Sequence, residues 1–132
     1  MCLGKVGDKK IAEEDMTVWK VCCVKEEYVI SSYRYFNYQF EEIYETPIEV
    51  EEYPDERIIH AGFHSFPNLI DAKREAEFWN ERDRIKEEMV IKCTIPKGTI
   101  YYEGEFRTGI GDTVIPVPSI ASEKIILHKP GQ

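Results

Sequence analysis

The sequence has no hydrophobic run of the roughly 20 residues that a transmembrane helix needs, and its first residues carry no apolar signal-peptide core. We therefore expect a cytoplasmic protein with no membrane partner. Without an export signal, the four cysteines are expected to be reduced thiols rather than a structural disulfide. Three of them, Cys22, Cys23 and Cys93, lie in apolar strand patterns, which indicates small core residues.

Recognisable cofactor, phosphate and metal motifs are absent as well. The chain has no phosphate loop, dinucleotide fingerprint, serine elbow or paired-cysteine zinc ribbon. Two of its three histidines, His60 and His64, are four residues apart, but Gly62 between them indicates a turn and no glutamate follows His60. We therefore predict neither a metal nor a cofactor.

The negative charge is concentrated in one segment. Residues 41–56 carry eight acids and no base, whereas the rest of the chain has as many acids as bases. Such a segment repels phosphate groups, so we expect no direct binding of nucleic acid, and it attracts partners with a basic patch. The alternative is a solvated edge that keeps the protein soluble.

The size and composition of the chain predict a single domain over residues 1–132, because 42% of the residues are hydrophobic and no linker interrupts them. Apolar and β-branched patterns predict strands, and their ranges are 17–24, 57–63, 88–95, 99–103 and 123–128. Pro67 and Asn68 open a helix with apolar residues at helical spacing to about Asp83. We predict an α+β fold, with a mixed or antiparallel sheet of about five to seven strands and one main helix on a face.

Prolines and glycines mark the connections between these elements. The residues Ile95-Pro96-Lys97-Gly98 match a type I turn, which predicts a hairpin between 88–95 and 99–103. Two prolines bracket an alternating acidic segment at 47–54, which predicts a short edge strand. The segment 114–118 contains too many prolines for a central strand.

Three residues are candidates for chemistry. His64 lies where a strand passes into the helix, so its imidazole suits a general base or a ligand contact, or else it packs as a structural residue under the helix. Cys2 becomes an N-terminal nucleophile if Met1 is removed, or stays an inert thiol. Glu103 follows two tyrosines at the end of a strand and is the third catalytic candidate, with a plain surface carboxylate as its alternative.

A tyrosine-rich stretch is the candidate binding surface. Six of the eight tyrosines fall between residues 28 and 53, next to the acidic segment. Tyrosine is apolar in body and polar at its tip, which suits recognition surfaces, although packing along the sheet accounts for the same pattern. The residues that we predict to bind a partner or ligand are Tyr33, Tyr35, Tyr38, Glu49, Glu51 and Tyr102.

Several short motifs resemble a group of small uncharacterised proteins from bacteriophages and gut bacteria. They are Met1-Cys2-Leu3, Trp19-Lys20-Val21, Gly62-Phe63-His64-Ser65-Phe66, Ile95-Pro96-Lys97-Gly98, Tyr101-Tyr102-Glu103-Gly104 and Ala121-Ser122-Glu123-Lys124-Ile125. The resemblance spans most of the chain and implies a single-domain protein of phage or bacterial origin. It implies no activity, but Cys2 and His64 lie inside the matching motifs.

Two functions follow from the sequence. The first is an interaction protein, phage-encoded as the resemblance implies, that binds and modulates a host protein such as a defence factor through its tyrosine and glutamate surface. The second is a pocket for a small molecule or nucleotide ligand, or a cysteine–histidine enzyme, at the strand–helix joint around His64. Whether the protein is an enzyme stays open at this point.

Overall fold

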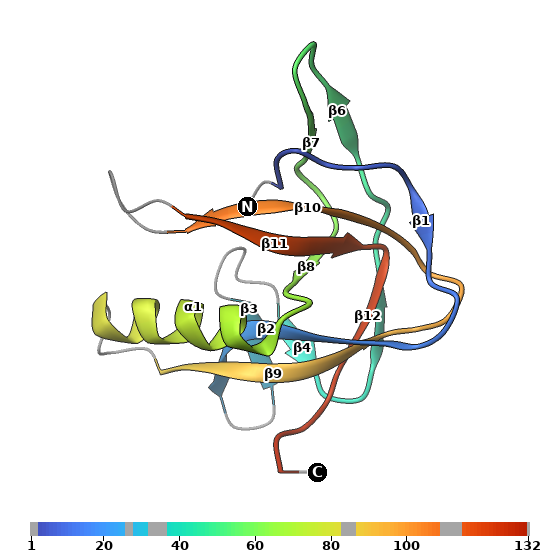
Figure 1. Ribbon diagram of the computed structural model, residues 1–132. Helices are drawn as coiled ribbons and strands as arrows, with labels where there is room; N and C mark the ends of the chain where they lie inside the picture. The colour runs from blue at the N-terminus through green and yellow to red at the C-terminus, as the bar shows by residue number, and fades with distance from the viewer. Residues whose placement is uncertain (1–2, 26–27, 32–36, 83–86, 109–114, 132) are drawn as a thin grey trace.

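A computed structural model describes residues 3–25, 28–31, 37–82, 87–108 and 115–131 (Figure 1). Within these residues there are one helix and twelve strands. The helix is α1 (Leu69–Arg82). The strands are β1 (Lys10–Ile11), β2 (Met16–Lys25), β3 (Tyr28–Ser31), β4 (Asn37–Gln39), β5 (Ile43–Glu45), β6 (Val50–Glu52), β7 (Arg57–Ile59), β8 (Phe63–Ser65), β9 (Glu88–Ile95), β10 (Ile100–Thr108), β11 (Ile115–Ser122) and β12 (Lys124–Leu127).

The largest sheet has six antiparallel strands in the order β4-β3-β2-β9-β12-β5. Its two longest neighbours, β2 and β9, pair from Met16 opposite Ile95 to Cys23 opposite Glu88. Successive side chains on a strand point to opposite faces, so Val18 and Cys93, which are paired, share the inner face. The apolar strands predicted over 17–24 and 88–95 are therefore confirmed as the centre of this sheet.

A second, four-stranded sheet has the order β1-β10-β11-β8 and is also antiparallel. The chain passes from this sheet into the first one between β11 and β12, with Glu123 at the corner, and a bridge between Trp19 and Phe66 joins the sheets again. The main core is shared by the two sheets. Its buried members include Val18, Cys22, Phe63, Ile91, Cys93, Ile95, Ile120, Ile125 and Leu127.

Helix α1 packs on the outer face of β2 and β9. Its small residues Ala72 and Ala76 approach Val21 and Phe66 closely in a second apolar cluster. The helix starts as the sequence predicts, because the Asn68 carbonyl accepts the first helical hydrogen bond, from the Ala72 amide at 3.3 Å. The predicted helix after Pro67 is thus confirmed.

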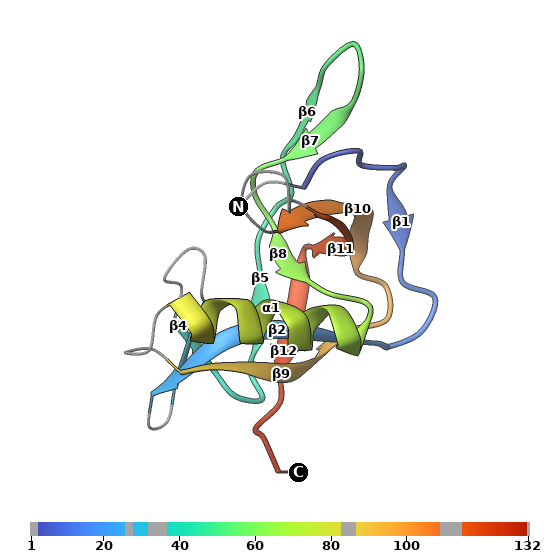
Figure 2. The same ribbon diagram turned by 60° about the vertical axis from the view of Figure 1, so that its left-hand side comes forward.

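A third sheet consists only of β6 and β7, which form a hairpin that projects from the body of the molecule (Figures 1 and 2). The N-terminal residues 3–7 run between this hairpin and β10. The Leu3 amide donates to the Ile59 carbonyl at 3.0 Å, and the Gly4 amide donates to the Glu105 carbonyl at 2.9 Å. This segment attaches the hairpin to the body by hydrogen bonds on both of its sides.

The α+β class is correct, but the arrangement of strands differs from the expected single sheet. The strands form three sheets of six, four and two members, and the register pairs of neighbouring strands are antiparallel. One helix against twelve strands makes the fold richer in strand than predicted. The difference arises because short strands of two to four residues carry too little periodicity to be seen in a sequence.

The predicted hairpin between β9 and β10 is wrong. A turn exists, but it lies one residue later than the predicted type I turn. The Thr99 amide donates to the Pro96 carbonyl at 3.1 Å, and Gly98, at the third position of this turn, has a φ of 87°, which is typical of type II. However, the Ala12 carbonyl accepts from the Gly98 amide, and β9 pairs with β2 and β12 while β10 pairs with β1 and β11. The turn therefore carries the chain from one sheet to the other.

β11 also departs from its prediction, because it lies between β10 and β8 despite its two prolines. Pro116 and Pro118 face β10 only, and β8 pairs only with residues 120–122. Proline lacks an amide hydrogen and is tolerated where one edge of a strand is unpaired. Both prolines therefore lie in the part of β11 that has an unpaired edge, although the C-terminal part of the strand lies between two neighbours.

Candidate functional site

His64 lies on β8 with only 7% of its surface exposed. Its ring makes an edge-to-face contact with Phe66 at 4.7 Å between centroids and a tilted contact with Phe106 at 5.3 Å. Burial, reinforced by the nearby Lys20 ammonium, holds the pKa of His64 well below its usual value. The imidazole is consequently neutral at pH 7 and packs within an aromatic cluster.

Lys20 is unusual for a lysine, because it is only 5% exposed although it carries an amine. It shares its strand face with Val18 and Cys22, since residues two apart on a strand point the same way. Its Nζ donates to the backbone carbonyl of His64 and lies 5.7 Å from the centroid of the Tyr38 ring. Burial lowers the pKa of Lys20 below its ordinary value.

The thiols near Lys20 are not activated. Burial raises the pKa of Cys22 to about 12, and burial likewise raises the pKa of Cys93. A thiol becomes a nucleophile only as the thiolate, so these two cysteines act as small apolar residues. Cys23 is buried as well, in agreement with its prediction as a core residue. Cys2, the predicted nucleophile, lies outside the described residues.

Glu103 lies at the surface, where its carboxylate pairs with the Lys10 ammonium at 3.0 Å. Tyr102 points to the other face of β10, into a small cluster with Leu3 and Ile59. In the register of the sheet, His64 lies opposite Ala121, which lies opposite Tyr102. Two strand spacings, about 10 Å, therefore separate Tyr102 from His64. His64 is buried and Glu103 is exposed, and their side chains point to opposite faces of the sheet.

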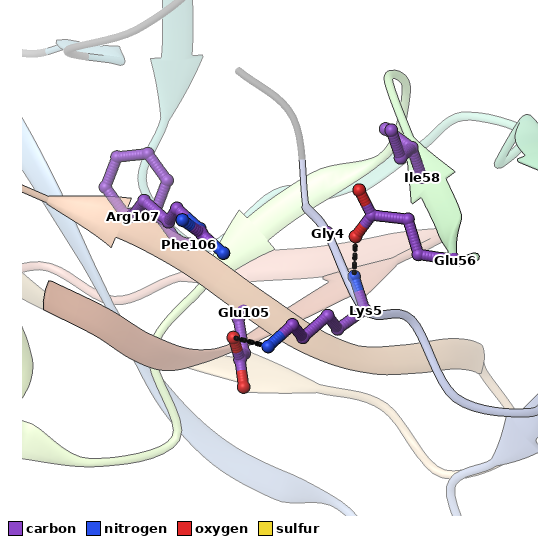
Figure 3. A pocket seen from close by; sticks show the side chains of 7 residues that line it. All are labelled: Gly4, Lys5, Glu56, Ile58, Glu105, Phe106 and Arg107. Atoms are coloured by element: carbon purple, nitrogen blue, oxygen red, sulfur yellow. Dashed lines mark hydrogen bonds and ion pairs between the residues drawn. The ribbon is translucent and has the colours of Figure 1, made fainter. Parts of the chain in front are cut away.

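A cavity of about 270 Å³ opens beside the N-terminal segment (Figure 3). The residues that line it are Gly4, Lys5, Glu56, Ile58, Glu105, Phe106 and Arg107. The Lys5 ammonium lies 4.0 Å from the Glu105 carboxylate, and the Lys5 amide donates to Glu56 Oε2 at 3.0 Å. These contacts attach the N-terminal segment to both β10 and the hairpin.

The β6–β7 hairpin presents its acids to solvent. Within residues 49–56 the carboxylates of Glu49, Glu51, Glu52, Asp55 and Glu56 are exposed. Glu51 accepts from the Tyr53 hydroxyl at 2.6 Å and lies 3.1 Å from His60 Nε2. These hydrogen bonds lower the pKa of Glu51, so the carboxylate is ionised at neutral pH. Glu52 lies on the opposite side of the strand, 3.6 Å from Arg57 Nε.

The tyrosines divide between core and surface. Tyr38 was expected on a recognition surface, but it is 3% exposed and packs edge-on against Tyr44 at 5.1 Å. Tyr33 and Tyr35 lie outside the described residues. Tyr53 is 52% exposed at the end of the hairpin, although the sequence did not single it out. The signal in the sequence that could have predicted this exposure is its position between two acids and a proline.

No protein-family model, curated protein or solved structure matches this chain. Over the described residues, no helix reaches the length and apolar character that a membrane crossing requires. In the same part of the chain, no group of three or more histidine, cysteine, aspartate or glutamate side chains is placed to hold a metal ion.

Proposed function

We propose that this protein acts by binding another protein through the acidic β6–β7 hairpin. The observation that carries the proposal is a contrast in exposure. The β6–β7 hairpin projects from the body (Figure 2). Its acidic residues are exposed, whereas His64 and Lys20 are buried. A projecting charged element is accessible to a macromolecule, and its field steers a partner of opposite charge. The partner therefore presents a basic patch.

The hairpin combines charge with an aromatic contact. Tyr53 lies between Glu51 and Glu52 on one side and Asp55 and Glu56 on the other, and half of its surface is exposed. Exposed tyrosine supplies contact area, whereas rim charges mainly set association rate and specificity. The partner that we propose is a host protein, such as a defence factor, in keeping with the phage or bacterial origin expected from the short sequence motifs.

Neutralising the hairpin tests this proposal. The triple change Glu49→Gln, Glu52→Gln and Asp55→Asn removes three exposed charges and keeps side-chain size. We expect this variant to capture its partners from a bacterial lysate about tenfold less well, since electrostatic steering depends on these charges. Quantitative mass spectrometry of the retained proteins, compared with the wild type, gives the measurement.

The matched control removes the same charge elsewhere. Glu13→Gln, Glu14→Gln and Glu77→Gln change exposed acids outside the hairpin, so this variant has the same net charge as the test variant. It is expected to retain the partners of the wild type. Equal losses in both variants would mean that overall charge, not the hairpin, governs capture, and the proposal would be abandoned.

The cavity in Figure 3 leaves a second function open, a pocket for a small ligand. It is separate from the strand–helix joint where the sequence predicted such a pocket, and two carboxylates and two cations line it. A small zwitterion complements such a lining. Isothermal titration calorimetry with amino acids as ligands tests this function. If the variants Glu105→Gln and Arg107→Gln give the same binding heat as the wild type, the cavity is excluded as the binding site.

A further inference from the structure

The two edges of the β6–β7 hairpin differ in what covers them. The outer edge of β7 is covered by the chain's own N-terminal segment, where Leu3 and Ile59 exchange two backbone hydrogen bonds of 3.0 Å each. The Val6 amide adds a third bond, to the Arg57 carbonyl at 3.2 Å. β6, in contrast, pairs with β7 alone among the residues that the structure describes.

An uncovered strand edge is a binding element, because its backbone amides and carbonyls accept an added strand whatever the sequence of that strand. Between the flanking Pro47 and Pro54, strand β6 contains no proline, so each of its residues keeps its amide hydrogen. The prolines limit the accessible edge to a short stretch, since proline cannot donate to a ladder. The edge therefore suits a short extended segment.

The side chains of β6 specify which segment fits. Glu51 and Glu52 are neighbours on the strand and so point to opposite faces. Glu51 is held by Tyr53 and His60, and Glu52 lies beside Arg57. An added strand thus meets a carboxylate on each face, and opposite charges placed across strands stabilise the pairing while like charges oppose it. A second copy of β6 would place acid against acid and is disfavoured.

We propose that β6 binds an extended, polybasic segment of the partner protein as an added β-strand. This inference rests on the proposed function and specifies the chemistry of the partner at the same hairpin. Lysine or arginine at neighbouring positions of the segment pairs with Glu51 and Glu52 on the two faces. Backbone hydrogen bonds to β6 hold the segment in the extended form, as residues 3–6 are held by β7 on the opposite edge.

The test uses a synthetic peptide of lysine, arginine and valine, Lys-Val-Lys-Arg-Val-Lys, and two versions of it in which alternate backbone amides are methylated. Methylation removes donors without changing charge. Alternate amides of an added strand face β6 or solvent. We expect one methylated version to bind at least about tenfold more weakly and the other to bind like the parent, with amide shifts in an NMR titration centred on residues 50–52.

The outcomes separate this inference from the proposed function. If both methylated peptides bind like the parent, or if the parent does not bind, the added strand is ruled out while the hairpin stands as a charged docking element. If the variant with Glu49→Gln, Glu52→Gln and Asp55→Asn retains its lysate partners in full, both the proposed function and this inference are overturned. Analytical sedimentation tests whether the protein forms a dimer. A dimer that Val50→Pro abolishes would show that a second copy binds this edge, and would overturn the proposal of a polybasic segment.

Discussion

The body of the molecule and the β6–β7 hairpin treat their polar side chains in opposite ways. The body encloses Lys20 and His64 among apolar and aromatic neighbours, and burial lowers the pKa of both. The hairpin exposes its carboxylates and holds Glu51 by hydrogen bonds that lower its pKa. The difference teaches that the amine and the imidazole, which could act as bases, are buried, whereas the carboxylates of the hairpin are accessible to a partner.

The largest expected difference between the two regions concerns stability. Phe66 is 1% exposed and packs against α1, His64 and Phe106, so Phe66→Ala is expected to cost about 3–5 kcal/mol of unfolding free energy. Tyr53 in the hairpin is 52% exposed, so Tyr53→Ala is expected to leave the unfolding free energy nearly unchanged. Urea unfolding of both variants measures this, and equal losses would contradict the division into body and hairpin.

The pH dependence of His64 gives the next largest effect. Its folded-state pKa lies well below 6.5, so the unfolded chain binds the extra proton first and stability is lost as the pH falls below about 6.5. Between pH 7 and pH 5 we therefore expect the wild type to lose more unfolding free energy than His64→Phe, which has no group to protonate at this position. Parallel pH profiles that never diverge would mean that His64 is protonated in the folded protein.

Gly104 tests the attachment of the hairpin to the body. A Cβ added there would lie 2.9 Å from the Gly4 carbonyl oxygen, which is too close for a backbone contact. Gly104→Ala is therefore expected to cost about 1.5 kcal/mol and to loosen the N-terminal segment, seen as faster hydrogen exchange at Leu3 and Gly4. In the control Gly7→Ala, the new Cβ meets the Glu103 carbonyl at an ordinary 3.8 Å, and exchange should not change.

Substitution of Lys20 is expected to have the smallest effect on stability, and it is expected to stabilise the protein rather than destabilise it. Lys20→Met replaces a buried amine by an apolar side chain of similar length and is expected to raise stability by about 1 kcal/mol at pH 7. The folded pKa of Lys20 is below the value of 10.5 in the unfolded chain, so the penalty for the wild type fades as the pH rises toward 10.5. A variant less stable than the wild type would show that the contacts to the His64 carbonyl and Tyr38 outweigh burial.

Much of the body was visible in the sequence, because long elements carry their own signals. The strands β2 and β9 show apolar and β-branched patterns over eight or more residues, and the Pro67–Asn68 start marks α1. The partners of these strands were not visible. Nothing local says that Gly98 binds the Ala12 carbonyl and so sends β10 into another sheet.

For the candidate site, too, the sequence predicts some features and only the packing decides others. The concentration of acids over 41–56 is a property of the sequence, and their exposure follows from their charge. Tyr38 shows the limit, since a tyrosine in a polar, aromatic stretch fits a surface or a core equally well. Only the packing of β4 against the main core placed it inside.

By itself, the sequence determined the class of the fold, the central strands and helix, and the acidic segment, since all of these depend on periodicity, capping and charge along the chain. The tertiary structure decided what each of these elements contacts. It buried Lys20 and His64, placed Glu103 at the surface, and, among the residues that the structure describes, left β6 paired with β7 alone. Strand pairing and burial bring together residues far apart in the chain, and no local pattern records which ones meet.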